Sequence, residues 1–82
     1  MCLAVPGKIT SRMERENGLS TATVDLQGSR LEVSLALVPQ ARVGDWILIH
    51  AGYAISRLEE SEARETWDYL HEAGILDKPA PE

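Results

Sequence analysis

The sequence is poor in cysteine and in basic side chains. It has one Cys in 82 residues, and eight Lys and Arg against thirteen Asp and Glu give a net charge of −5. A single cysteine excludes a disulfide within the chain. Because nucleic-acid binding draws most of its affinity from Lys and Arg that neutralise phosphates, this charge argues against nucleic acid and against anionic membranes as partners.

Long apolar runs and the strong metal or nucleotide signatures are also missing. No apolar stretch approaches the ~20 residues that cross a bilayer. The opening residues, MCLAVPGKIT, have neither the basic segment nor the apolar run of a signal peptide. The sequence has no Cys-x-x-Cys pair, no His-Glu-x-x-His motif and no glycine-rich phosphate loop. We therefore expect a cytoplasmic protein whose thiol stays reduced.

The composition is that of one small globular domain. Apolar residues make up 44% and charged residues 26%, which is typical of folded proteins and argues against a disordered chain. We predict a single domain over residues 1–74 and a flexible tail over residues 75–82, because Gly74 is a natural helix stop and prolines follow it.

Alternating apolar residues predict a series of short strands. The first, over residues 3–9, is interrupted by Pro6 and Gly7, which favours an edge strand or a bulge because proline cannot donate to a ladder. Residues 10–19 are expected to form a hairpin arm that turns at Asn17-Gly18, with Met13 facing inward. Two more strands follow, with inward residues Ala22, Val24 and Leu26 in one and Leu31, Val33, Leu35 and Leu37 in the next.

The second half of the chain changes from strand to helix periodicity. Residues 46–50 are apolar on both faces, so they predict the most buried strand, which we expect to continue to about residue 55 past Gly52. A helix over residues 58–73 is indicated by Ala63, Trp67 and Leu70 on one face, with Tyr69 packed beside them. Ser56 and Glu59 have the spacing of a capping box at its start.

These elements fix the expected fold class. A meander of short strands with one terminal helix cannot pack as a two-layer α/β fold, so the sheet must close on itself. We predict a mainly β protein, a small OB-like β-barrel of about five to six short strands with one C-terminal α-helix.

Cys2 is the first candidate functional residue. Removal of Met1, which is usual before a small residue, would leave a free α-amine beside the thiol, and these two groups form a compact chelating pair. Thiolate suits iron, copper and zinc, and the α-ammonium is expected to lower the pKa of the thiol. The alternative is structural, because cysteine often serves as a small buried hydrophobe.

Few other residues have catalytic or ligating chemistry. His50 ends the most apolar strand and could reach the barrel rim, although a satisfied structural histidine is the alternative. His71 suits the last turn of the helix, and Asp45 suits a turn. No nucleophile, base and orienting group are arranged as an enzyme needs, so we expect a protein that is not an enzyme.

The donor count limits the kind of metal site. Cys2 with its α-amine and one histidine offer at most three donor atoms, whereas a closed zinc site needs four. Any ion held here must therefore bring ligands of its own or share those of a partner. The N-terminal arm is the candidate partner-binding segment, and its residues are Cys2, Leu3, Pro6, Gly7 and Lys8. Trp46 or Tyr53 could also anchor a protein partner.

Three stretches carry a resemblance to a known family. MCLAVPGKI, VDLQG and GDWILIHAGYAI, followed by an acidic helix, resemble the HypC/HupF/HybG family of hydrogenase maturation chaperones over residues 1–73. Tyr53 stands where phenylalanine is common in that family, and the residues after Gly74 match no family pattern.

The resemblance implies a small barrel that helps to build the nickel-iron hydrogenase active site. It implies two partners, a HypD-type iron-sulfur scaffold and the precursor of the hydrogenase large subunit. The cargo would be iron carrying cyanide and carbon monoxide, with Cys2 as the essential thiol and His50 as a second ligand or helper. The competing interpretation is a protein-binding adaptor in which Cys2 provides only a contact and no iron is held.

Overall fold

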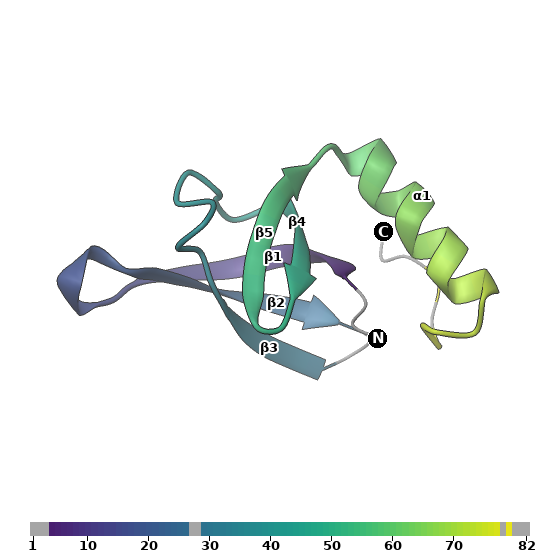
Figure 1. The fold of residues 1–82 in the computed structure, drawn as a ribbon, viewed down its shortest axis with the longest axis horizontal. Coiled ribbons are helices and arrows are strands. Elements are labelled where there is room, and N and C mark those ends of the chain that lie inside the picture. The colour runs from purple at the N-terminus through teal and green to yellow at the C-terminus, as the bar shows by residue number, and fades with distance from the viewer. Residues whose placement is uncertain (1–3, 27–28, 78, 80–82) are drawn as a thin grey trace.

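The computed structural model describes residues 4–26, 29–77 and 79. It contains a five-stranded closed barrel and one helix, as Figure 1 shows. The elements are β1 (Val5–Glu14), a 3₁₀ turn (Glu16–Gly18), β2 (Ser20–Leu26), β3 (Ser29–Ser34), β4 (Trp46–His50), β5 (Tyr53–Leu58) and α1 (Glu60–Glu72). The predicted mainly β barrel with one C-terminal helix is therefore confirmed.

The strands close in the order β1-β2-β3-β5-β4, and all neighbours but one are antiparallel. The exception is the parallel contact between β3 and β5, which consists of the single pair Ser34 and Tyr53. One further hydrogen bond, in which the Ser34 N–H donates to the Gly52 carbonyl at 2.9 Å, supports that closure. The barrel is thus strongly paired around four of its junctions and barely closed at the fifth.

β1 is a central strand, so of the two alternatives predicted for it the edge position is wrong, and a register irregularity is present but lies beyond Pro6 and Gly7. It pairs with β2 and with β4, and its register shifts at a bulge between Ile9 and Ser11. The N–H of Ile9 bonds to the carbonyl of Asp45 on the β4 side, so by alternation the backbone of Pro6 points toward the other side. There the described pairing with β2 begins only at Lys8, and the proline removes no ladder bond in the described residues.

The β1–β2 hairpin projects from the barrel as the long arm at the left of Figure 1. Gly18 turns it with a φ of 75°. Met13 is 53% exposed, so the prediction that it faces inward is wrong. Arg12 connects the arm to the loop after β3, because its guanidinium donates to the carbonyls of Pro39 and Ala41. It also donates to the hydroxyl of Ser20, in β2.

β3 ends earlier than its alternating pattern suggested. Leu35 is fully buried but Leu37 is 61% exposed, because the chain leaves the sheet after Ser34. The following loop folds over the barrel interior, and its buried residues Leu35, Val38 and Ala41 join the barrel core.

The segment after β4 is a hairpin rather than one long strand. Ala51 and Gly52 turn the chain, and β5 returns alongside β4. Ser56 and Leu58 belong to β5, so the predicted capping box at Ser56 is wrong. The capping box is formed by Glu59 and Glu62 instead, each side chain accepting from the other's backbone.

The helix covers a second core beside the barrel. Ala63, Trp67 and Leu70 are buried as predicted, and Trp46 from β4 meets Trp67 edge to face with ring centroids 6.2 Å apart. Tyr69 is 74% exposed, so its predicted packing against the barrel is wrong. Beyond the helix, Leu76 is 4% exposed and packs into this cluster, so the predicted tail does not leave the fold at residue 75.

We predict that Trp67→Ala destabilises the protein by about 3–5 kcal/mol, because the change empties the centre of the helix–barrel core. Tyr69→Ala, an aromatic truncation two residues away on the exposed face, is the matched control and should change stability by no more than about 0.5 kcal/mol. Urea denaturation followed by circular dichroism measures both. A loss below about 1 kcal/mol for Trp67→Ala would show that the helix is not held by this contact.

The stability of the fold is also expected to depend on pH, through two carboxyl groups that form ion pairs at the hairpin arm. The Ser20 hydroxyl and the Arg12 guanidinium lower the pKa of Glu14 below its usual value of 4.5, and Arg15 and Thr21 do the same for Glu32. A carboxyl whose folded-state pKa is lowered stabilises the fold above its unfolded pKa, and this stabilisation is lost as the pH falls through the folded value.

The urea midpoint should therefore fall as the pH is lowered below about 4.5. In the double variant Glu14→Gln, Glu32→Gln this part of the pH dependence should be reduced. An unchanged slope in that variant would contradict the assignment.

Candidate functional site

The candidate site is the end of the barrel where β1 begins and β4 ends. β1 and β4 are antiparallel, and Val5 is the partner of Ile49. One more step in this register sets Ala4 across from His50. Cys2 and Leu3, the predicted ligand and the first predicted contact residue, lie outside the described residues.

A tight turn fixes the position of His50. Ala51 and Gly52 both have positive φ, 53° and 83°, as the two central residues of a type I′ hairpin turn require. The turn holds His50 directly opposite Tyr53. His50 is half-buried and Tyr53 is 49% exposed, so an imidazole and a phenol ring flank the same turn at this end of the barrel.

The rest of the predicted contact segment is mostly internal. Pro6 and Gly7 are buried in the barrel wall, and a Cβ added at Gly7 would lie 2.8 Å from Cδ1 of Ile49. Lys8 is half-buried, between Asp25 of β2 and Trp46 of β4. Pro6 and Gly7 therefore pack inside the barrel wall, with Gly7 allowing close approach to Ile49, and neither is exposed at the surface.

Other sequence-based candidates have structural positions. Asp45 accepts hydrogen bonds from the Arg42 N–H at 3.0 Å and from Arg57 at 3.2 Å, which confirms it as a turn residue. Trp46 is buried under the helix, so it cannot anchor a partner, whereas Tyr53 can. Over the described ranges no three His, Cys, Asp or Glu side chains gather as a metal site would need.

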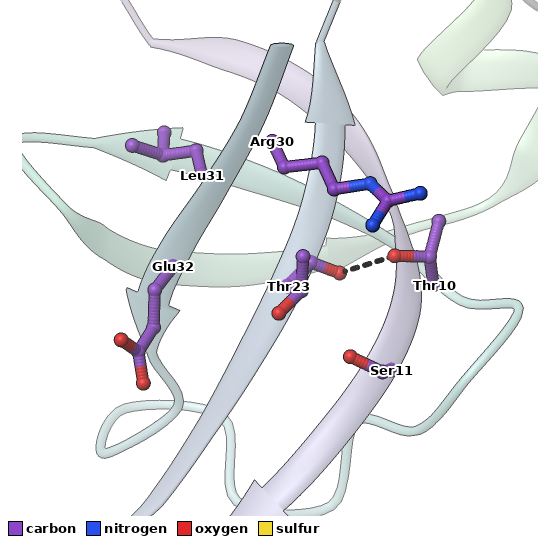
Figure 2. Close-up of a pocket in the computed structure, with 6 residues that line it drawn as sticks. All are labelled: Thr10, Ser11, Thr23, Arg30, Leu31 and Glu32. Atoms are coloured by element: carbon purple, nitrogen blue, oxygen red, sulfur yellow. Dashed lines mark hydrogen bonds between the residues drawn. The ribbon is translucent and has the colours of Figure 1, made fainter.

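Sequence reasoning missed a polar hollow on the outer face of β1, β2 and β3. Figure 2 shows its lining, which is Thr10, Ser11, Thr23, Arg30, Leu31 and Glu32. The Thr10 hydroxyl donates to the Thr23 carbonyl at 3.1 Å, and Arg30 extends across Thr23 toward Thr10. The available signal was the run of polar residues, Thr10, Ser11, Thr23, Arg30 and Glu32, on three consecutive strands.

With this geometry established, comparison with known families places the chain. The HupF/HypC family matches residues 1–70, from the N-terminal segment through β1, the barrel and most of α1. The chain belongs to the HupF/HypC family.

Individual relatives agree with this assignment along nearly the whole length. The hydrogenase maturation factor HypC of Synechocystis is 42% identical over 76 residues, which cover 92% of this chain and all of the relative. The HypC of Cupriavidus necator is 38% identical and covers 100% of this chain and 87% of the relative. The HypC of Escherichia coli K12 is 42% identical, with shares of 85% and 79%. Within the part of this chain that the structure describes, no helix is long and apolar enough to cross a membrane.

The turn beside His50 gives a prediction for this HupF/HypC protein. Ala51 has a φ of 53°, a conformation that costs a residue with a Cβ about 1–2 kcal/mol. Ala51→Gly removes that cost but adds backbone entropy to the unfolded state. We expect a net stabilisation of up to about 1 kcal/mol, measured by thermal and urea denaturation. A variant clearly less stable than the native protein would contradict the positive-φ assignment.

Proposed function

We propose that this protein is a hydrogenase maturation chaperone that carries an iron centre on Cys2. Its membership of the HupF/HypC family and its similarity to proteins named hydrogenase maturation factor HypC support the maturation role. The iron, bearing cyanide and carbon monoxide, is cargo in this proposal. It is received with a HypD-type scaffold and delivered to the precursor of the hydrogenase large subunit.

The geometry of the barrel end supports pairing of Cys2 with His50. The register of β1 and β4 sets Ala4 across from His50, and two peptide units can span at most about 7 Å. The pairing of Val5 with Ile49, the residue before His50, is the observation that carries the proposal. It supports a thiolate and an imidazole within reach of one ion, and these are soft and borderline donors.

The small number of donors fits a carrier better than a resident metal site. Iron with cyanide and carbon monoxide already has most of its coordination sphere filled, so one thiolate and one imidazole suffice to hold it. A cage of four protein ligands would retain the metal. One or two donors on a terminal segment can be displaced by the cysteines of an acceptor, and this exchange is what a delivery protein needs.

The second candidate is an adaptor that joins two partner proteins without binding iron. The half-exposed Tyr53 next to His50 favours it, since exposed aromatic side chains are frequent anchors of protein interfaces. In that case Cys2 would be a contact residue, and a side chain of similar size would replace it.

Substitutions at Cys2 separate the two candidates. In a host lacking its own copy of this protein, Cys2→Ala and Cys2→Ser should each reduce hydrogenase activity at least tenfold, because neither side chain binds iron as a thiolate does. Both variants should have the native melting temperature, which rules out misfolding as the cause. Normal activity with Cys2→Ser would contradict iron ligation and support the adaptor.

The role of His50 is tested by His50→Gln, with Tyr53→Phe as the control on the opposite strand. A ligand or helper predicts a loss of activity at normal protein abundance for His50→Gln and little change for Tyr53→Phe. Equal losses in the two variants would indicate that this end of the barrel acts only as a contact surface.

A further inference from the structure

The outer edge of β3 is left without a partner strand. β3 pairs with β2 along its whole length, from Ser29 to Ser34, but meets β5 only at Ser34. Figure 1 shows the β4–β5 turn resting on β3 near its end, with the earlier part of the strand extending beyond it. For the described residues, Ser29–Val33 therefore form an open strand edge, which is a template for pairing with another chain.

Two hydrogen bonds determine which backbone groups point out of this edge. The Leu35 N–H bonds to Ser20 on the β2 side, and the Ser34 N–H bonds to Gly52 on the β5 side. Since direction alternates along a strand, the N–H and C=O of Arg30 and of Glu32 point away from β2. These four groups are the pairing groups that the edge offers.

The charges on the edge make it complementary to itself. Arg30, Leu31 and Glu32 are consecutive, so two copies running antiparallel about a twofold axis at Leu31 set each Arg30 opposite a Glu32. We propose that this protein self-associates through β3, with β3 of a second copy continuing the sheet. All four outward groups of each copy then pair, and both cross-strand pairs are of opposite charge, an arrangement that stabilises a sheet.

The side chains fit this register. Leu31 is 41% exposed although its partner Val24 is fully buried, and at the twofold axis it would meet its own copy at the closer, non-hydrogen-bonded spacing of about 4.5 Å between Cα atoms. Arg30 lies in the open hollow of Figure 2 and forms no ion pair with any described residue. Glu32 forms an ion pair with Arg15 of the same copy, through its Oε2 atom.

The neighbouring registers are disfavoured by charge. In the two nearest registers that still set outward N–H and C=O groups opposite each other, the twofold axis lies at Arg30 or at Glu32. These registers pair Arg30 with Arg30, or Glu32 with Glu32, of the second copy. Like charges directly opposite destabilise a sheet, so only one register is favourable. An unrelated peptide would lack this match, which is why a second copy is the preferred occupant.

The expected dimer is weak. A strip of five residues is far smaller than the ~800 Å² per partner of a standard interface, and each copy has a net charge of −5. We therefore expect a reversible dimer that forms at high protein concentration.

Charge reversal tests the proposal by sedimentation equilibrium up to about 1 mM protein, a concentration at which an affinity of −4.1 kcal/mol gives half-occupancy. The native protein should dimerise. Arg30→Glu alone and Glu32→Arg alone should each weaken dimerisation at least tenfold, and a mixture of the two variants should form a heterodimer at least as strong as the native dimer. Arg42→Glu, at an exposed arginine away from β3, is the control and should dimerise normally.

Amide hydrogen exchange gives an independent reading of the same edge. Protection of the Arg30 and Glu32 amides should rise with native protein concentration and should not rise for Arg30→Glu. A native protein that stays monomeric at 1 mM, a dimer unaffected by Arg30→Glu, or a mixture that does not associate would each overturn the proposal.

Discussion

The two-sided pairing of β1 is the constraint on which the rest of the structure depends. β2 pairs with one edge of this strand and β4 with the other, so the first strand of the chain joins both halves of the barrel. Gly7 permits this, because a Cβ there would press on Ile49. The consequence is positional, since the pairing of Val5 with Ile49 brings the start of β1 and the end of β4 to the same end of the barrel.

The helix stabilises this arrangement by packing against β1 and β4 from outside the barrel. Trp67 and Trp46 form a core between α1 and the outer face of the barrel, while the barrel interior is filled by a separate cluster that includes the loop after β3. The barrel cluster includes Ile49, the residue before His50, and Val5, the partner of Ile49, packs against the helix core. Ala51 and Gly52 themselves are exposed in the turn after His50, so the positive φ of Ala51 lies outside both cores.

The sequence predicted the fold class, the inward face of β2, the burial of β4 and the buried face of α1, because these follow from alternation, apolar runs and helical spacing over several residues. It failed where tertiary contacts override local pattern. β1 is central although it contains proline, because the missing N–H of Pro6 faces away from β4. Leu37 continues the alternation of β3 but lies outside the sheet, since the loop turns to bury Val38. Tyr69 and Met13 have large hydrophobic side chains, yet both are exposed because α1 and β1 turn other faces toward the core.

For the site, the sequence identified His50 and the N-terminal thiol, but it could not predict that β4 turns back at Ala51 or that the register sets Ala4 across from His50. The turn is local, but Gly52 alone does not distinguish a hairpin from a bulge, and the register depends on pairing between β1 and β4, which are distant in sequence. The hollow beside Arg30 and the open edge of β3 were missed for the same reason. An edge exists only because β5 meets β3 at a single pair, which no property of β3 itself foretells.

The most direct test of iron carriage by Cys2 is anaerobic purification of the native protein and of Cys2→Ala from the native host, followed by infrared spectroscopy and iron analysis. Iron carriage predicts cyanide and carbon monoxide stretching bands together with bound iron in the native sample, and neither in the variant. Bands of equal strength in both samples, or partner proteins recovered equally with both and no bands in either, would contradict it.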